Sequence, residues 1–431
     1  MASSAPLLAG PRSGAPERPP SSSDVVQEWA AGELPSSWKD AGRGWGHGLH
    51  KLSPYVGGFP PQLARYFILN LTDPGATVFD PFSGRGTSLL EALLCDRDAV
   101  ASDAFEYAVV LSGAKATPMT AGAFSAYLEM KLVESRSVNN RGFRLLDSDD
   151  LRVVFSDYTL DQLLRLREVL RDDESTEATF TKAVVCGVLH GPSKMFLSAP
   201  QKDQTSSTVG YVRRYLARHG IERPRRDIYD SAMAKIDRSD LERLPRRRGT
   251  VHRADSRAVP LEDRSVDLIV TSPPYMAVLD YSWNNWLRLW WLGCDRVAER
   301  EKLILSRRED VYRAFMRDTL TEMFRVLSDD SAAVIVVGDV KTTSGVLNSA
   351  LLIAEEAVQA GFEVECVIDD VYKLNARSML VLNSLKWGYD STSHVDKSSV
   401  LIDRCLVLRK GAIRWRWPEI DWSAIGKSRL F

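Results

Sequence analysis

The sequence lacks the features that would mark a disulfide framework, a metal site or a membrane protein. Its five cysteines stand far apart with no C-x-x-C pair, and its six histidines complete no zinc-ligand spacing. No apolar run approaches the ~18 residues that span a bilayer. Residues 1–23 are rich in Ala, Pro, Ser and Gly and hold no apolar stretch long enough for a signal peptide. We therefore expect a disordered tail and a cytoplasmic protein.

The chain also lacks a large net charge: its formal net charge is -1. This average hides an asymmetry between one segment and the rest. Residues 201–257 hold 15 Lys and Arg against 8 Asp and Glu, an excess of +7 that leaves -8 for the remainder. A basic segment is typical of a solvated helical face and also of a surface that binds phosphate groups, and both interpretations are open at this point.

The first regular pattern is a strand, a Gly-containing loop, a helix and a second strand. An apolar-periodic helix ends near Leu71, and Thr77–Phe79 then reads as a short buried strand. A helix is expected over Thr87–Leu94, and Ala99–Asp103 reads as a strand that ends in a carboxylate. This unit begins a doubly wound parallel sheet. From about residue 108 to residue 248 the pattern changes to helices and charged loops, which we interpret as an insertion.

The alternation of strands and helices resumes at Val251 and predicts an α/β fold with a doubly wound, mostly parallel sheet. The further elements expected are a strand over Val266–Val270, a helix over Tyr312–Leu327, a strand over Ala333–Val337, a helix over Val346–Ala360, and strands over Phe362–Ile368 and Arg404–Leu408. The predicted organisation is a tail (1–23), a discontinuous α/β domain (24–110 and 250–412), a largely helical insertion (111–249) and a C-terminal tail (413–431).

The loop from Asp80 to Thr87 follows a strand and precedes a helix, where glycines allow a ligand to approach the backbone. It has neither the third glycine of the dinucleotide fingerprint nor the Gly-Lys-Ser/Thr of a phosphate loop. A cofactor without phosphates fits better: Asp80 would meet an ammonium group, and Asp103 would accept both hydroxyls of a ribose. A turn with a glycine pair and a helix-capping Asp is the alternative interpretation.

The octapeptide D-P-F-S-G-R-G-T (80–87) resembles the first motif of the amino-directed DNA methyltransferases, the N4-cytosine and N6-adenine enzymes. In that family D-P-F-x-G-x-G-T binds S-adenosylmethionine, and residues 55–65 resemble the segment that flanks this motif. The resemblance implies a Rossmann-like class I methyltransferase fold with S-adenosyl-L-methionine as cofactor. By resemblance Asp103 matches the ribose-binding acid, and Asp255 matches the residue beside the adenine. The implied cofactor-binding residues are Asp80, Phe82, Ser83, Gly84, Gly86, Thr87, Asp103 and Asp255.

Ser272-Pro273-Pro274-Tyr275 directly follows the apolar strand and resembles the S-P-P-Y motif of the same family. Two prolines remove two N–H donors and stiffen the turn, so its oxygen atoms are available to a ligand. The Ser272 hydroxyl and the Pro273 carbonyl would accept the two N–H protons of an exocyclic amine and aim its lone pair at the methyl group. Tyr275 would stack on a base that has left the duplex. A rigid core turn is the alternative role of this tetrapeptide.

In the family that this motif resembles, serine at the first position often accompanies N4-cytosine methylation, so the resemblance favours cytosine N4 as the target and leaves adenine N6 open. No cysteine stands in a comparable loop, which disfavours methylation of a ring carbon. Asp280 and Tyr281 begin an aromatic helix and would line the base pocket, while most of its tryptophans are expected in the core.

The cofactor motif precedes the catalytic motif, whereas S-P-P-Y members of the family commonly have the reverse order, so the subgroup stays open. The insertion between the two motifs is the expected target-recognition region for double-stranded DNA, and Tyr211 or Tyr215 would stack there. The residues expected to contact phosphates are Lys202, Arg213, Arg214, Arg225, Arg226, Arg246, Arg247 and Arg248.

Other functions are also consistent with these motifs. P-P-Y loops also serve amino groups of RNA bases, although an RNA methyltransferase would be expected to carry an RNA-binding domain near its N-terminus. A small-molecule methyltransferase would not need the basic insertion, and a non-catalytic nucleic-acid-binding protein would not need the acceptor and carboxylate positions. The chain would serve a restriction-modification system with a separately encoded restriction enzyme, a phage-defence system with its own partner, or act as an orphan enzyme.

Overall fold

The computed structural model describes residues 32–33, 46–139, 149–191, 195–199, 208–239, 241, 243–276, 280–342, 345–373 and 400–411. The strands in these segments are β1 (Gly32–Glu33), β2 (Thr77–Asp80), β3 (Asp98–Asp103), β4 (Thr250–Arg253), β5 (Val266–Thr271), β6 (Leu327–Gly338), β7 (Val340–Thr342), β8 (Gly345–Leu347), β9 (Glu363–Lys373) and β10 (Val400–Lys410). Eight of them form one sheet in the order β1-β9-β10-β6-β5-β2-β3-β4, and β7 and β8 pair separately.

The large sheet is parallel except at one strand. β6, β5, β2, β3 and β4 pair in parallel, whereas β10 is antiparallel to both of its neighbours, β6 and β9. The chain builds the sheet outward from β2 to β3 and β4 on one side, and from β5 to β6 on the other. The strand order therefore reverses between β2 and β5, where ligands bind in doubly wound sheets. The predicted doubly wound, mostly parallel sheet is confirmed.

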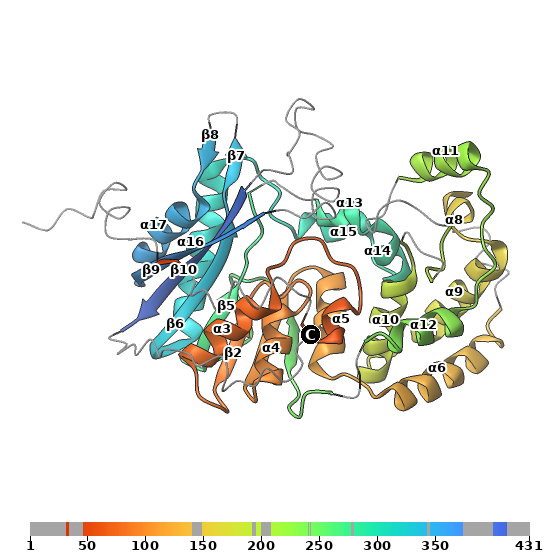
Figure 1. Cartoon of the computed structure of the whole chain (residues 1–431), viewed down its shortest axis with the longest axis horizontal. Helices are drawn as coiled ribbons and strands as arrows, with labels where there is room; N and C mark the ends of the chain where they lie inside the picture. The colour runs from red at the N-terminus through yellow and green to blue at the C-terminus, as the bar shows by residue number, and fades with distance from the viewer. Residues whose placement is uncertain are drawn as a thin grey trace, which may run out of the picture.

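Helices cover both faces of this sheet (Figure 1). Successive side chains of a strand point to opposite faces. Val78 and Leu268 pack in a cluster with α3 and α4, whereas the adjacent Phe79 and Ile269 pack in a cluster with α16 and α17. The helices of the α/β part are η1 (Gly48–Lys51), α3 (Pro61–Leu71), α4 (Thr87–Leu94), α5 (Glu106–Ala116), α13 (Tyr281–Asn284), α14 (Trp286–Leu292), α15 (Arg296–Glu301), α16 (Glu309–Val326) and α17 (Ser349–Gln359).

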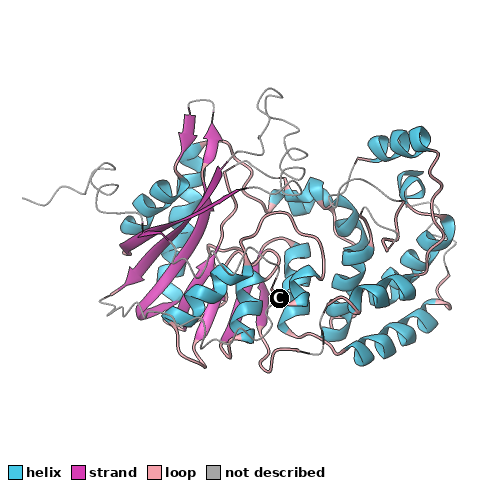
Figure 2. Cartoon of the chain, in the orientation of Figure 1, coloured by secondary structure: helices cyan, strands magenta, loops and turns pink. Residues whose placement is uncertain are grey.

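The segment between β3 and β4 is helical after α5, and Figure 2 shows its helices gathered at one side of the sheet. They are α6 (Ala121–Ser135), α8 (Asp149–Val154), α9 (Asp157–Leu170), α10 (Thr176–Val188), α11 (Val209–His219) and α12 (Ile228–Ile236). Five of them begin at a side chain that accepts a hydrogen bond from a backbone amide of the first turn. These capping residues are Thr120, Ser156, Ser175, Thr208 and Asp227.

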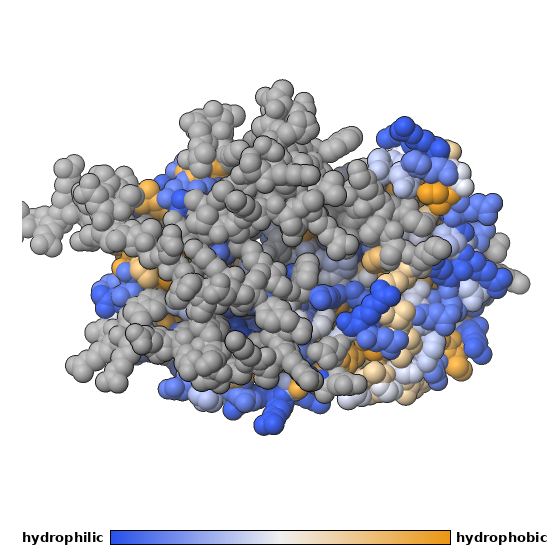
Figure 3. All heavy atoms as spheres, in the orientation of Figure 1, coloured by the Kyte–Doolittle hydropathy of each residue, from blue (hydrophilic) through white to orange (hydrophobic). Residues whose placement is uncertain are grey.

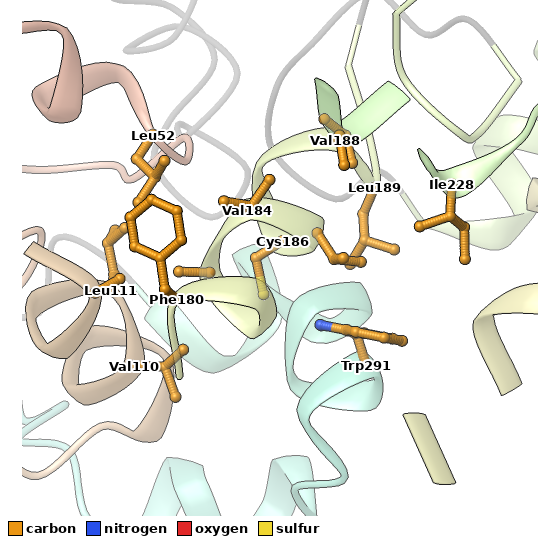
Figure 4. Close-up of a cluster of buried hydrophobic side chains, with 14 of the residues drawn as sticks. Leu52, Val110, Leu111, Phe180, Val184, Cys186, Val188, Leu189, Ile228 and Trp291 are labelled. Atoms are coloured by element: carbon orange, nitrogen blue, oxygen red, sulfur yellow. The ribbon is translucent and has the colours of Figure 1, made fainter. Parts of the chain in front are cut away.

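Helix α10 joins the helical segment to the α/β part through buried side chains (Figure 4). Phe180 lies near Leu52 and Leu111, which come from the loop after η1 and from α5, while Cys186 lies on the side of Trp291 from α14. Each of these side chains is at most 2% exposed. The largest hydrophobic cluster thus draws on both parts of the chain, and the boundary expected at residues 110 and 111 falls inside α5.

Several predicted elements differ from the structure. The helix expected from Val346 begins at Ser349 because the Asn348 side chain caps it, and Gly345–Leu347 is strand β8. The strand expected over Ala333–Val337 is the second half of β6, which has twelve residues. The aromatic helix is broken at Asn285 into α13 and α14. The predicted tails, 1–23 and 413–431, lie outside the described residues. Among the helices described, none is long and apolar enough to cross a membrane.

Candidate active site

Asp80 and Thr271 end the two strands that flank the reversal point of the sheet. Asp80 Oδ1 accepts hydrogen bonds from Thr271 Oγ1 at 2.6 Å and from the Phe82 amide at 3.1 Å. Ser88 Oγ, in the first turn of α4, donates to the Val270 carbonyl at 2.7 Å. These bonds tie the Gly-rich loop after β2 to the end of β5. Burial raises the pKa of Asp80 to about 6, although its hydrogen bonds favour the carboxylate.

The Gly-rich loop turns at two glycines in the left-handed region, Gly84 with φ +48° and Gly86 with φ +73°. A Cβ atom at Gly86 would lie 3.0 Å from Ser112 Oγ and 3.2 Å from Ser112 Cα, so any side chain there would press on α5 in addition to straining the left-handed backbone. The hydroxyls of Ser83 and Ser112 are hydrogen-bonded to each other with their oxygens 3.0 Å apart, and Thr87 Oγ1 accepts a hydrogen bond from Arg85 Nε at 3.0 Å. The predicted residues Ser83 and Thr87 are buried and hold the loop in shape.

Asp103 ends β3, the strand next to β2, and its carboxylate faces the loop. Its Oδ2 accepts a hydrogen bond from the Gly84 amide at 2.9 Å, and its Oδ1 accepts one from the Phe105 amide at 3.0 Å. Burial raises the pKa of Asp103 to about 6. A carboxylate offers about four lone-pair sites, so Asp103 keeps acceptor capacity for a hydroxyl group beyond its bonds to the backbone.

Helix α5 supports the loop from behind. Ser112 Oγ donates to the Gly84 carbonyl at 3.3 Å, and Lys115 Nζ donates to the Arg85 carbonyl. Lys115 is completely buried, and burial together with the nearby Arg85 guanidinium lowers its pKa well below the ordinary value. Residues from 111 onward were expected in the insertion, so both side chains were missed. A serine and a lysine within the otherwise apolar stretch 107–116 are the signal that could have revealed them.

Two tyrosines form an aromatic wall beside the loop. A Cβ atom at Gly84 would lie 3.3 Å from Tyr55 Cε1, and the rings of Tyr55 and Tyr281 stack with centroids 5.8 Å apart at 26°. Burial, with Asp103 nearby, raises the pKa of both tyrosines, so both hydroxyls are protonated at neutral pH. Tyr281, expected in the base pocket, thus lies next to the cofactor loop, and Tyr55 brings in the segment expected to flank that loop.

The ends of three neighbouring parallel strands carry the acids expected to bind a cofactor, Asp80 at β2, Asp103 at β3 and Asp255 after β4. Asp255 is exposed and forms a forked ion pair with Arg257, with its shortest distance 2.7 Å. The Arg257 guanidinium lies 5.6 Å from the Phe315 ring, and the Phe82 ring lies 6.0 Å from the same ring. Acids, glycines and aromatic rings along one sheet edge fit an elongated cofactor with an ammonium group, a diol and a flat ring.

The tetrapeptide 272–275 follows β5, on the other side of the reversal point from β2. Tyr312 Oη of α16 donates to the Pro274 carbonyl at 3.0 Å, which fixes the turn. Within the described part of the chain, no hydrogen bond engages Ser272 Oγ or the Pro273 carbonyl, the two predicted acceptors. The Tyr275 ring lies beside the end of β6, because a Cβ atom at Gly338 would be 3.7 Å from it. Tyr312 was expected only as the first residue of a helix, so its contact with the tetrapeptide was missed.

Asp280 has a structural role at the start of α13. Its Oδ1 accepts hydrogen bonds from Ser282 Oγ at 2.6 Å and from the Trp283 amide at 3.1 Å, and its Oδ2 pairs with Arg300 at 2.8 Å. These contacts hold the pKa of Asp280 below its usual range, although partial burial opposes them. Of the tryptophans in this segment, Trp291 is buried as expected, whereas Trp283 is 48% exposed.

The structure separates the predicted DNA-contacting arginines into three groups: 213 and 214, 225 and 226, and 246–248. Arg213 and Arg214 are exposed on α11. Arg225 stacks on the Tyr158 ring at 4.1 Å, and Arg226 donates to the Phe196 carbonyl, so both hold the insertion together. Lys202 lies outside the described residues.

The arginines at 246–248 lie far along the sheet from the candidate site. They directly precede β4, which runs parallel to β2 and β3, and Arg247 pairs with Asp98 at the first residue of β3. They are therefore at the amino edge of the sheet, whereas both motifs are at the carboxyl edge. The structure does not bring them together with the tetrapeptide.

A family model described as DNA methylase matches residues 27–112 and 266–410, together more than half of the chain. This match spans both motifs, skips most of the helical insertion and confirms the resemblance drawn from the sequence. No curated protein matches the chain.

Solved structures give more distant likenesses. A candidate DNA modification methylase of Thermus thermophilus is 22% identical, with a TM-score of 0.21, over 38% of this chain and 53% of that protein. This chain therefore spans about half the length of that structure. An S-adenosylmethionine-dependent methyltransferase of Methanosarcina mazei is 9% identical with a TM-score of 0.31, over 80% of this chain and 96% of that one. TrmN of Thermus thermophilus is 14% identical with a TM-score of 0.31, over 84% of this chain and 52% of that one.

Proposed function

Because the chain belongs to the DNA methylase family, we propose that it is a DNA methyltransferase that modifies an exocyclic amine of a flipped base, namely N4 of cytosine. S-adenosylmethionine is the cofactor, as the resemblance implied. The observation that supports the proposal most directly is which oxygen atoms of the tetrapeptide 272–275 are already hydrogen-bonded. Its Pro274 carbonyl is held by Tyr312, while Ser272 Oγ and the Pro273 carbonyl make no hydrogen bond within the described residues.

The residues on the cofactor side would bind S-adenosylmethionine and orient it. Asp80 would face the ammonium group, Asp103 would accept the two ribose hydroxyls, and Asp255 would lie beside the adenine. Gly84 and Gly86 let the loop turn tightly against Tyr55 and Ser112, so that the loop backbone would face the cofactor, and Tyr55 and Tyr281 would close one side of the site. When bound, S-adenosylmethionine supplies a methyl group on a positively charged sulfur.

Residues on the substrate side prepare the amine. Its lone pair is delocalised into the base, so it is a weak nucleophile until the nitrogen becomes pyramidal. Ser272 Oγ and the Pro273 carbonyl would each accept one N–H bond and fix the direction of the lone pair. The product nitrogen carries one proton fewer than the amine, and that proton passes to solvent. Stacking on Tyr275 would recover roughly 1–3 kcal/mol of the cost of extruding the base.

The cytosine assignment rests on serine at the first position of the tetrapeptide. In the family that this motif resembles, serine there often accompanies N4-cytosine methylation, and Asp or Asn there is usual for N6-adenine.

The test incubates the protein with tritiated S-adenosylmethionine and unmethylated genomic DNA, followed by digestion to nucleosides. Label in N4-methylcytosine supports the proposal, and label in N6-methyladenine keeps the reaction but overturns the base. Transfer to RNA alone, or to neither nucleic acid, overturns the DNA assignment.

Variants of two serines on the flanks of β5 separate catalysis from folding. Ser272→Ala is expected to reduce the transfer rate at saturating cofactor by about 10–100-fold, because an acceptor aimed at the reacting amine is lost. Ser265→Ala is the matched control, since Ser265 is exposed just before β5 at the opposite edge of the sheet. Equal rates for the two variants would show that Ser272 does not act on the substrate.

A further inference from the structure

Helix α11 stands on the outer part of the insertion with little support. Val212 is its only buried residue, and the helix packs against α8. Thr208 caps its start, and Gly220, at φ +59°, ends it. A helix that buries one side chain leaves most of its surface to solvent or to a partner.

The exposed surface of α11 is basic and lacks compensating acids. Arg213, Arg214 and Arg218 are exposed, and no Asp or Glu occurs between Val209 and His219. Within the described part of the chain none of these three arginines forms an ion pair or a hydrogen bond. Helix α9 differs, because its Arg165 forms an ion pair at 2.8 Å with Asp161, four residues earlier on the same helix.

Aromatic rings form a row along the same helix. The rings of Tyr211 and Tyr215 stack with centroids 6.0 Å apart at 19°, and the His219 ring lies 4.5 Å from that of Tyr215. Residues four apart share a helix face, so Arg214 and Arg218 form a second row next to the rings. A row of cations beside flat rings suits a nucleic-acid strand, because phosphates carry the charge and bases or sugars lie against rings.

The position of α11 suits the same DNA that reaches the tetrapeptide. In Figure 1, α11 lies at the top right, along the same upper edge of the view as α13 in the middle and β7 and β8 at the left. Figure 3 shows hydrophilic residues over this helix. Another exposed basic pair, Arg246 and Arg248, precedes β4 and therefore lies at the amino edge of the sheet, opposite the edge that carries the tetrapeptide.

We propose that α11 is a docking surface for the sugar-phosphate backbone of double-stranded DNA, with Arg214 and Arg218 as its phosphate contacts. This inference rests on the proposed function, since it assigns where the DNA substrate lies. It also divides the basic segment into one arginine cluster that binds DNA and others that do not.

The experiment measures binding of a fluorescent, unmethylated 30-base-pair duplex by anisotropy over a series of KCl concentrations. Each phosphate contact contributes about 0.9 to the slope of log affinity against log salt, so Arg214→Ala with Arg218→Ala should reduce the slope by about 2. Its affinity at low salt should fall by at least about tenfold. The double variant is expected to fold, because both side chains are exposed and alanine favours helix.

Arg246→Ala with Arg248→Ala is the matched control, because it removes the same charge from another exposed site. Its slope and affinity should equal those of the unaltered protein. The docking surface would be overturned if both double variants lost slope and affinity equally, or if neither variant lost any.

The methylation assay on the same preparations distinguishes this failure from failure of the proposed function. If the unaltered protein methylates DNA while the α11 variant binds and methylates equally well, only the docking surface is wrong. If the unaltered protein neither binds nor methylates DNA, both proposals are wrong. Preferential binding of the α11 arginines to a duplex RNA of the same length would also overturn the assignment of DNA as the partner.

Discussion

At the scale of single residues, Asp80 and Asp103 give the candidate cofactor site its expected pH dependence. Burial raises both pKa values to about 6, so both side chains are ionised above pH 7 and become protonated below pH 6. A protonated carboxyl loses its charge toward an ammonium group and one acceptor site toward a diol. Affinity for the cofactor should therefore decrease as the pH falls through 6.

The prediction is checked by calorimetric titration with S-adenosylhomocysteine between pH 5 and pH 8. Asp103→Asn should bind about 10–100-fold more weakly at pH 8, since a charge-assisted acceptor is lost. It should also show a shallower dependence on pH, because only Asp80 still titrates in this range. Asp157→Asn serves as control, since Asp157 is an exposed acid in the first turn of α9. A flat affinity in the unaltered protein from pH 5 to pH 8 would contradict the assignment of both carboxylates.

At the scale of secondary-structure elements, α5 determines the shape of the cofactor loop. Lys115 donates to the Arg85 carbonyl from a completely buried position, next to the left-handed Gly86. Lys115→Met keeps much of the length of the side chain but leaves that carbonyl without its donor, at a cost of about 1–3 kcal/mol. The loop is then expected to relax, which lowers cofactor affinity by about 5–50-fold.

Kinetics separate this positioning role from a general loss of stability. The KM for S-adenosylmethionine should rise in Lys115→Met, while kcat at saturating cofactor should change by less than about threefold. Lys51→Met is the control, because Lys51 is exposed on η1. An unchanged KM, or a loss confined to kcat, would show that Lys115 does not support the loop.

The sequence predicted the elements next to the motifs better than those far from them. The Gly and Pro residues around Asp80 and Ser272 end strands abruptly, so both loops were placed at strand ends, as the structure shows. The two loops come together through strand order, which depends on contacts between residues nearly two hundred positions apart. β10 inserts antiparallel between β6 and β9, and no local pattern in Val400–Lys410 reveals that position.

Strand direction and burial also explain why composition alone misplaced several arginines that were predicted to contact DNA. The run at 246–248 reads as a basic patch, yet it precedes a parallel strand and therefore lies at the edge opposite the motifs. Arg226 reads as an exposed cation, yet burial lowers its pKa and it holds the Phe196 carbonyl. Composition gives charge but not partners, so the acids and carbonyls that engage each arginine emerge only from the fold.

At the scale of the whole molecule, the insertion and the α/β part share one hydrophobic cluster and are expected to unfold together. α10 packs between α5, which supports the cofactor loop, and α14. At Gly187 of α10 the backbone approaches the loop after η1 so closely that a Cβ atom would lie 2.1 Å from the Leu52 carbonyl oxygen. Gly187 therefore determines how closely the two parts of the chain can pack.

Gly187→Ala should force α10 away from Leu52 and lower the free energy of unfolding by at least about 1–3 kcal/mol. Gly122→Ala is the matched control, since no atom lies within 4 Å of its Cβ position, and alanine there should stabilise α6 by up to about 1 kcal/mol. Denaturant unfolding followed by circular dichroism and by tryptophan fluorescence measures both changes.

Because α10 contacts α5, Gly187→Ala should also weaken cofactor binding when binding is measured at a temperature well below the melting temperature of the variant. Two separate transitions in the unaltered protein, or normal cofactor binding in Gly187→Ala, would show that the insertion and the cofactor site are independent.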